Sequence, residues 1–196
     1  MPLQNRVTPT GEIISTPEKG RWMGNRGRLH DGDKRLGRAR WQGRRWIICA
    51  LKFGGRHRTE MMRPDSYTEL FFLDEATALA AGHRPCAECR RRDYIRFMAL
   101  SGGPTGADAL DRALHAQRLE RREKRTWTAD ATDLPDGTFI EDGNRALLIA
   151  CGTCHLWSPG GYGPAQPLPQ GPVAVLTPEL SVEALRNGYA VQIGLG

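Results

Sequence analysis

Two cysteines three positions apart, Cys86 and Cys89, are the feature that most constrains how this chain can fold. A predicted helix begins after Asp74 and ends at Gly82, because Asp is a favoured N-cap and Gly commonly follows the last helical turn. A second helix is predicted from about Cys89 to Leu100. A CxxC turn between two helices can put both sulfurs on one metal ion, but tetrahedral Zn²⁺ takes four ligands. The sequence therefore predicts a zinc site that needs two further ligands.

A second CxxC pair, Cys151 and Cys154, is the preferred source of those ligands. Two such pairs in one chain are a strong zinc pattern, and four thiolates would make a closed, structural site. An alternative keeps the site in the first half of the chain, with Cys49 as the third ligand and His30 or His83 as the fourth. A further interpretation is that all five cysteines are small buried hydrophobic residues.

Basic residues are concentrated in the first part of the chain. Residues 1–125 contain 26 of the 28 Lys and Arg against 15 of the 22 Asp and Glu, a net charge of +11. Residues 126–196 contain two basic residues against seven acids, a net charge of −5. Because the planar fork of arginine suits phosphate, this asymmetry predicts a nucleic-acid partner, with DNA preferred. A solvated basic surface is the alternative.

Arginines beside the first CxxC pair, together with those on both sides of the predicted strand 46–53, are the expected phosphate contacts. They are Arg44, Arg45, Arg56, Arg58, Arg84, Arg90, Arg91 and Arg92. Residues 21–45 also interleave arginines and glycines with Trp22 and Trp41. Their rings either stack on bases or are anchored in the core, and the sequence leaves both open.

The fold class that these patterns predict is α+β, with a small antiparallel sheet and helices around a zinc knuckle and a β-rich C-terminal subdomain. Strands at Trp46–Phe53 and Tyr67–Leu73 are expected to pair, and Asp142-Gly143-Asn144 is typical of a hairpin turn. Further strands are expected at 138–141, 146–150, 172–177 and 189–193, with a helix at about 182–187. The predicted domains are an extended arm (1–20), a basic zinc domain (21–100), a linker (101–106), a helix (107–125) and the acidic subdomain (126–196).

The sequence offers no membrane or secretion pattern. It has no apolar run of membrane-spanning length and no hydrophobic region of a signal peptide at its N-terminus. We therefore expect a cytoplasmic protein whose thiols are reduced or bound to metal.

Residues 75–92, EATALAAGHRPCAECRRR, resemble the metal-binding N-terminal domain of the Ada DNA-alkylation repair family. In that family a helix with the pattern (E)AxxAGxRPCxxC leads into zinc-bound cysteines. The matching positions are Glu75, Ala76, Ala80 or Ala81, Gly82, Arg84, Pro85, Cys86 and Cys89. The run LFFLDEATALAAGHRPC is also similar to that of a group of bacterial proteins, which implies no mechanism.

The Ada resemblance implies a small α+β zinc fold on a DNA backbone. It also implies a zinc-activated thiolate that accepts a methyl group from a phosphotriester. The family's accepting cysteine belongs to an upstream C-x3-C pair, which this sequence lacks. Only Cys49 lies in the comparable region.

We therefore predict a zinc-binding protein that binds nucleic acid without catalysis of its own. One alternative is an Ada-like repair methyltransferase or a zinc-knuckle nuclease, for which Asn25 and His30 lie in a suggestive basic segment. The other is a metal-stabilised protein-interaction module whose basic half binds its own acidic tail or an acidic partner. The sequence contains no glycine-rich phosphate loop and no recognisable Ser/His/Asp arrangement.

Overall fold

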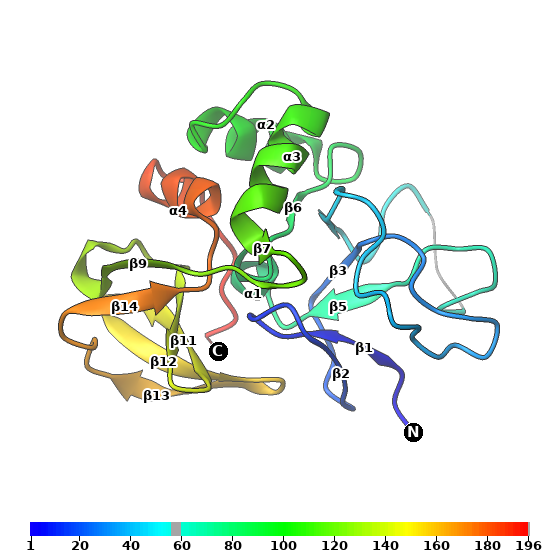
Figure 1. Ribbon diagram of the computed structural model, residues 1–196, viewed down its shortest axis with the longest axis horizontal. Coiled ribbons are helices and arrows are strands. Elements are labelled where there is room, and N and C mark those ends of the chain that lie inside the picture. Colours follow the sequence, from blue (N-terminus) through cyan, green and yellow to red (C-terminus); the bar gives the residue numbers. More distant parts are fainter. Residues whose placement is uncertain (56–59, 196) are drawn as a thin grey trace.

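The structure is a computed structural model that describes residues 1–55 and 60–195. Two six-stranded sheets lie on either side of a short central helix (Figure 1). The strand order is β2-β1-β5-β3-β4-β6 in the first sheet and β13-β12-β11-β10-β14-β9 in the second. The chain is therefore of the mixed α+β class, and the predicted β-rich character of its C-terminal part is confirmed.

The first sheet is built from short strands and the helices from 6 to 12 residues each. The strands of the first sheet are β1 (Gln4–Val7), β2 (Ile13–Ser15), β3 (Trp22–Asn25), β4 (Ile47–Cys49), β5 (Leu70–Phe72) and β6 (Arg84–Pro85). The helices are α1 (Glu75–Ala80), α2 (Arg91–Leu100), α3 (Ala107–Arg118) and α4 (Glu179–Arg186). A two-stranded ribbon, β7 (Leu119–Glu120) with β8 (Glu123–Lys124), follows α3.

The second sheet is formed by the acidic part of the chain. Its strands are β9 (Trp127–Asp130), β10 (Phe139–Asp142), β11 (Arg145–Ala150), β12 (Thr153–Ser158), β13 (Gly161–Gln166) and β14 (Pro172–Val175), with a 3₁₀ turn at Ala131–Asp133. The predicted hairpin is confirmed, because β10 and β11 pair antiparallel across Gly143-Asn144. Ile140, Leu147, Ile149 and Val175 form the core on one face of this sheet.

Two expectations for the first sheet are wrong. The strands expected to pair directly, β4 and β5, are separated by β3, which pairs antiparallel with both of them. Residues 1–20 are not a separate arm, because β1 and β2 form a hairpin whose first strand pairs parallel with β5. The buried side chains of Val7 and Ile13 anchor this hairpin in the main core.

The central helix α1 has the expected cap, since Asp74 accepts a hydrogen bond from the Thr77 N–H at 2.8 Å. The acidic residues at its start also hold the C-terminal segment of the chain. Glu75 accepts from the Tyr189 hydroxyl at 2.6 Å, and Asp74 accepts from the Gly194 N–H at 2.8 Å. The strand predicted at 189–193 is therefore wrong: that segment is irregular and is fixed by side chains of α1.

Helix α3 is shorter than the predicted helix 107–125. It ends at Arg118, where Leu119 turns to extended backbone and the β7–β8 ribbon begins. The Arg118 side chain is fully buried and donates to the Gly82 carbonyl at 2.7 Å. A Cβ on Gly82, whose φ is +89°, would lie 2.6 Å from the Arg118 side chain. This close approach couples the end of α3 to the end of α1.

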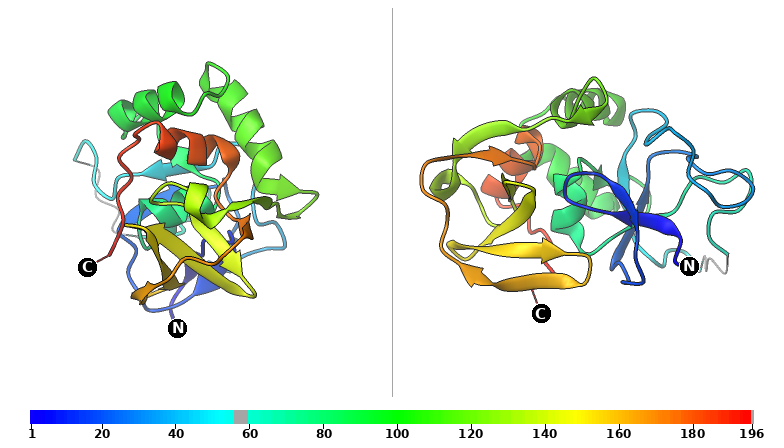
Figure 2. Two further views of the ribbon diagram at one scale, coloured as in Figure 1. Left: turned by 90° about the vertical axis from the view of Figure 1, so that its left-hand side faces the viewer. Right: turned by 60° about the horizontal axis from the view of Figure 1, so that its bottom comes forward.

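Helices α2, α3 and α4 cover one side of the molecule together (Figure 2). Phe97 of α2, Leu110 of α3 and Leu185 of α4 belong to one hydrophobic core. The predicted linker 101–106 is a mostly exposed connection between α2 and α3, with only Ser101 buried, and α4 packs against α2.

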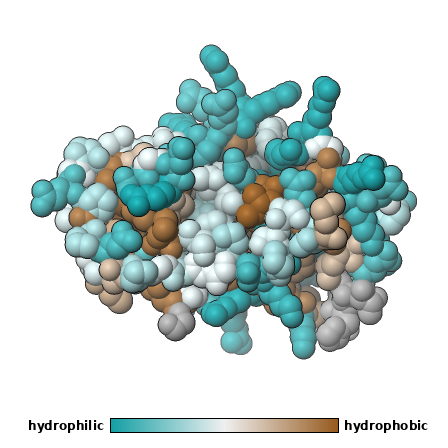
Figure 3. Space-filling view, turned by 90° about the horizontal axis from the view of Figure 1, so that it is seen from below, coloured by the Kyte–Doolittle hydropathy of each residue, from teal (hydrophilic) through white to brown (hydrophobic). Residues whose placement is uncertain are grey.

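The surface of the molecule carries both hydrophilic and hydrophobic side chains. Seen from below, hydrophilic side chains surround most of the face and hydrophobic residues appear in separate patches (Figure 3). Among residues 1–55 and 60–195, no helix is both long and apolar enough to cross a membrane.

Candidate metal centre

Three cysteines from different parts of the chain converge at one end of the first sheet. The sulfurs of Cys49, Cys86 and Cys89 all lie within 4.8 Å of one another. Tetrahedral zinc with Zn–S bonds of about 2.3 Å separates its sulfur ligands by about 3.8 Å. The spacing of the three thiols therefore suits a single metal ion.

Parallel strand pairing explains why Cys49 and Cys86 meet. Strands β4 and β6 run side by side, with Ile47 opposite Arg84 and Ile48 opposite Pro85. The next residue of each strand is a cysteine, and the Cys86 N–H donates to the Ile48 carbonyl at 2.9 Å. Since parallel strands end at the same edge of a sheet, both sulfurs are delivered to one place.

The turn from Cys86 into α2 brings the third sulfur. The Arg90 N–H donates to the Cys86 carbonyl at 3.1 Å, which closes the turn that carries Cys89. The Glu88 N–H points at the Cys86 sulfur at 3.4 Å. Backbone N–H groups directed at sulfur, and the positive end of α2 just beyond, both favour a thiolate there.

The three thiols differ in acidity because they share hydrogen bonds. Bonds from the thiols of Cys49 and Cys89, and then from backbone N–H groups, lower the pKa of Cys86 to about 2. The same sharing, together with burial, raises the pKa of Cys49 far above its usual value. One thiolate is thus stabilised by the cluster itself, and a metal cation would favour ionisation of all three.

A cavity of about 220 Å³ opens directly on the cysteine cluster. Met23, Asn25, Leu51, Phe53 and Tyr67 are among the residues that line it, together with the three cysteines. No imidazole or carboxylate of the described residues joins the three sulfurs as a fourth metal ligand. Three protein ligands and an open side are the arrangement in which zinc keeps an exchangeable fourth position.

The predicted four-cysteine site is wrong, because the structure does not bring Cys151 and Cys154 to the first CxxC pair. Cys151 is exposed at the β11–β12 turn. Cys154 is buried in the core of the second sheet, and its thiol donates to the Pro167 carbonyl at 3.3 Å. The alternative with Cys49 as third ligand is therefore the one that the geometry supports.

Neither histidine of that alternative completes the site. His30 is held by the Thr68 hydroxyl at 2.7 Å and the Arg63 carbonyl at 3.1 Å. His83 is fully buried, accepts from Arg26 Nε at 3.2 Å, and lies against Phe72. Burial, followed by the nearby Arg26, lowers the pKa of His83 well below its usual value. Both rings serve the packing of the first sheet.

Two of the predicted phosphate contacts are buried ion pairs instead. Arg84 forms a two-pronged bond with Asp111, with both contacts at 2.8 Å. Arg90 pairs with Glu75 at 2.7 Å and with Asp93 at 2.7 Å. Buried arginines need such partners, so these two side chains position the cysteine turn and are not available to a polyanion.

Four other predicted contacts do reach the surface. Arg44 and Arg45 precede β4, and Arg91 and Arg92 form the first turn of α2. Arg45 makes an exposed ion pair with Asp108 at 2.9 Å. Arg56 and Arg58 lie outside the described residues.

The two tryptophans of residues 21–45 have different environments. Trp22 is anchored, since its Nε1 donates to Gln192 at 2.7 Å and the Arg90 guanidinium lies 4.1 Å from its ring centroid. Trp41 is half-buried beside His115, with ring centroids 4.8 Å apart, and lines a pocket that is separate from the cysteine cavity. Core anchoring thus describes Trp22 but not Trp41.

No local sequence pattern marks Cys49 as a metal ligand. Its strand reads as buried and apolar, and one cysteine shows no metal spacing. The predicted strand 46–53 places Cys49 in its interior, whereas β4 ends at Cys49 and its parallel pairing with β6 aligns this residue with Cys86. Comparison of the chain with family models, curated proteins and solved structures found no match.

Proposed function

We propose that this chain binds one zinc ion through Cys49, Cys86 and Cys89 and contacts nucleic acid through exposed arginines next to that site. The observation that carries the proposal is the convergence of three sulfurs within 4.8 Å of one another from two strand ends and a helix start. Soft thiolate ligands select zinc, copper(I) or iron–sulfur clusters, and tetrahedral sulfur sites favour zinc or iron–sulfur.

The metal would fix the end of β4, the end of β6 and the start of α2 with respect to one another. Arg91 and Arg92 lie two and three positions after the third ligand, in the first turn of α2, so zinc would hold their side chains in a constant place on the surface. Arginines fixed in this way lose less conformational freedom when they bind phosphate than mobile ones do.

Zinc content per chain, measured by elemental analysis, tests the metal part. We expect about one zinc in the parent and little in Cys86→Ser. The matched control is Cys151→Ser/Cys154→Ser, which removes the other CxxC pair and is expected to keep the full zinc content. Loss of zinc in the control, or no zinc in the parent, would overturn the proposed site.

Fluorescence anisotropy with labelled duplex DNA across a salt series tests the nucleic-acid part. We expect affinity to fall steeply as salt rises, because each phosphate contact releases a counterion. The variant Arg91→Ala/Arg92→Ala should bind more weakly and lower the salt slope by about 2. Arg186→Ala, in α4, removes an exposed arginine elsewhere and should leave both unchanged. An unchanged slope in the double variant contradicts this surface.

A second candidate function is Ada-like methyl transfer to a thiolate of the cluster. The observation that favours it is that Cys49, the only cysteine in the region of the family's acceptor, belongs to the cluster and lines its cavity. Its thiolate would attack the methyl carbon of a methyl phosphotriester, forming an S–C bond while the C–O bond breaks and the electron pair leaves on the phosphate oxygen.

Mass spectrometry after incubation with methylated DNA separates the two functions. A gain of one methyl group on Cys49, absent in Cys49→Ser, would establish transfer. An unchanged mass in a zinc-loaded chain that binds the DNA would leave binding alone.

A further inference from the structure

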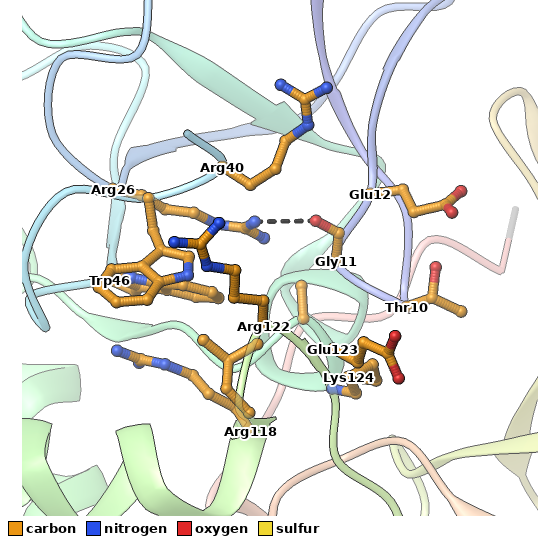
Figure 4. Close-up of a pocket in the computed structure, with 13 residues that line it drawn as sticks. Thr10, Gly11, Glu12, Arg26, Arg40, Trp46, Arg118, Arg122, Glu123 and Lys124 are labelled. Carbon is orange, nitrogen blue, oxygen red and sulfur yellow. Dashed lines mark hydrogen bonds between the residues drawn. The ribbon is translucent and has the colours of Figure 1, made fainter. Parts of the chain in front are cut away.

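A second pocket, of about 330 Å³, lies between the β1–β2 turn, the first sheet and the end of α3 (Figure 4). Five of its lining residues are cations and two are carboxylates: Arg26, Arg40, Arg118, Arg122 and Lys124, against Glu12 and Glu123. None of the residues that line it also lines the cysteine cavity. The pocket is therefore a separate and strongly positive site.

The floor of the pocket is a tryptophan held between two arginines. The guanidinium carbons of Arg26 and Arg118 lie 4.0 and 3.9 Å from the centroid of the Trp46 ring. Their exposed fractions are 1% for Arg26, 0% for Arg118 and 2% for Trp46. Stacking and burial fix the planes of both guanidinium groups before any ligand binds.

These two buried arginines and the half-buried Lys124 have carbonyl partners but no carboxylate partner among the described residues. Arg26 donates to the Gly11 carbonyl at 2.8 Å, as the dashed line in Figure 4 marks. Arg118 donates to the Gly82 and Arg44 carbonyls at 2.7 Å each, and Lys124 donates to the Ala80 carbonyl. The nearest acid on α3, Asp111, is already paired with Arg84.

Capping of α1 explains part of this arrangement. The carbonyls of Ala80 and Gly82 lie at the C-terminal end of α1, where cations are favourable. A helix end supplies only about half a unit of negative charge, however, while two guanidinium groups and the Lys124 amine meet here. Two buried donors, Arg26 Nη2 and Arg118 Nε, also have no hydrogen-bond partner among residues 1–55 and 60–195.

The lowered pKa values of these groups agree with a cluster of positive charges that no neighbouring anion neutralises. Burial, followed by repulsion from Arg26 and Arg118, lowers the pKa of Lys124 to about 7. Burial lowers the pKa of Arg118 to about 8. A guanidinium nevertheless remains protonated in proteins, so the folded chain carries buried positive charge that an anion would compensate.

The rim of the pocket offers both further cations and an aromatic surface. Arg40 and Arg122 are exposed, and for Arg122 the described residues provide neither a hydrogen bond nor an ion pair. Together with Trp41 they also line an adjoining cavity of about 480 Å³. A ligand with a charged group in the first pocket can thus extend over the half-buried Trp41 ring.

We propose that this pocket binds a phosphate monoester, with the phosphate among Arg26, Arg40, Arg118 and Arg122 and a planar base stacked on Trp41. Guanidinium groups match phosphate oxygens in two-pronged hydrogen bonds, and a dianion offsets more of the charge than a monoanion such as a carboxylate. A base stacks on tryptophan whatever its identity. Two sources carry this chemistry: a free mononucleotide, and the 5′-phosphate end of a nucleic-acid strand.

The test is titration calorimetry of the zinc-loaded chain with inorganic phosphate and with adenosine monophosphate. Both should bind, and Arg40→Ala/Arg122→Ala should bind each at least tenfold more weakly. These two side chains are exposed, so their removal should leave the fold intact. Arg186→Ala, which removes an exposed arginine of α4 outside the pocket, is the matched control and should keep the parent affinity. Trp41→Ala should weaken the nucleotide several-fold and leave inorganic phosphate unchanged.

Oligonucleotides with and without a 5′-phosphate distinguish the two sources. Tighter binding of the phosphorylated strand, lost in Arg40→Ala/Arg122→Ala, identifies a strand end as the ligand. Binding of the mononucleotide with no preference between the strands identifies a free nucleotide.

The proposal is overturned if neither phosphate nor nucleotide binds, or if Arg186→Ala weakens binding as much as the pocket variant. Because zinc content is a separate measurement, failure of this pocket and failure of the proposed metal site are distinguishable.

Discussion

The two CxxC sequences of this chain have the same spacing but lie in different kinds of turn. Cys86 and Cys89 lie on a turn between a parallel strand and a helix, so both sulfurs face Cys49. Cys151 and Gly152 form the two-residue turn of a β-hairpin, with Ala150 paired to Thr153. The hairpin leaves one sulfur in solvent and puts the other, that of Cys154, in the core.

The backbone at each turn accounts for this difference. In the β11–β12 turn, φ is +50° at Cys151 and +70° at Gly152, as a tight hairpin turn with two left-handed residues requires. A CxxC pair can bind a metal only where the turn directs its sulfurs to one side, and a strand alternates them across the sheet. Spacing therefore predicts a metal site only together with the element that carries it.

Removing one sulfur from each turn should give the largest contrast. If zinc joins β4, β6 and α2, Cys86→Ser should lose the metal and lower the free energy of unfolding by about 4 kcal/mol or more, roughly 10 °C in the thermal midpoint. Cys151→Ser should change the midpoint by no more than about 2 °C, because its side chain is exposed. Calorimetry of both variants checks this. Equal losses would mean that the two turns are not functionally different.

The carboxylates that support the two turns should also differ in importance. Asp111 neutralises Arg84, two positions before Cys86, in a fully buried pair. Asp111→Asn should cost about 3 kcal/mol because it leaves a buried guanidinium without its counter-charge. Asp136 only accepts the Cys151 N–H at 2.9 Å at an exposed site, so Asp136→Asn should cost about 1 kcal/mol or less. Denaturant unfolding measures both, and a larger loss for Asp136→Asn would contradict the ranking.

The pH dependence of stability distinguishes the positively charged pocket that contains Lys124 from both cysteine turns. The folded pKa of Lys124, about 7, lies below its ordinary value of 10.5, because burial first and then Arg26 and Arg118 lower it while Glu141 opposes them. Between pH 7 and 10.5 the unfolded chain thus holds a proton that the folded chain lacks, so Lys124 makes stability rise with pH over that window. Below pH 7 both states are protonated and this contribution is constant.

Lys124→Met should therefore flatten the rise in unfolding free energy between pH 7 and 10.5. Lys19→Met, which removes an exposed lysine, should keep the parent slope. Thiol and metal titrations are common to all three proteins and cancel in the comparison. A parent slope retained in Lys124→Met would show that this ammonium is not buried among the arginines.

Local sequence patterns predicted the elements whose ends are determined locally. Asp74 and Gly82 bound α1 as expected, and Gly143-Asn144 forms the predicted hairpin turn. These residues act through hydrogen bonds and φ preferences within a few positions, which a sequence displays directly. The closeness of the Cys86 and Cys89 sulfurs, which their spacing predicts, has the same local origin.

Contacts between distant residues account for the errors. Arg84 and Arg90 are charged and read as surface residues, but their partners Asp111 and Glu75 lie far along the chain. Cys49 joins the cluster only through the pairing of β4 with β6. Periodicity and spacing cannot display such pairings, because tertiary contacts decide which charges are buried.

The smallest expected effect is a gain in stability at the second CxxC turn. Cys151 adopts φ +50°, a conformation that costs an ordinary side chain about 1 kcal/mol and that asparagine tolerates better. Cys151→Asn creates the Asn-Gly pair preferred in such turns and should raise the free energy of unfolding by about 0.5 kcal/mol, with zinc content unchanged. The matched change Cys89→Asn removes a proposed ligand and should lose zinc. If Cys151→Asn also lost zinc, the exposed cysteine would have to take part in metal binding, and the contrast between the two turns would fail.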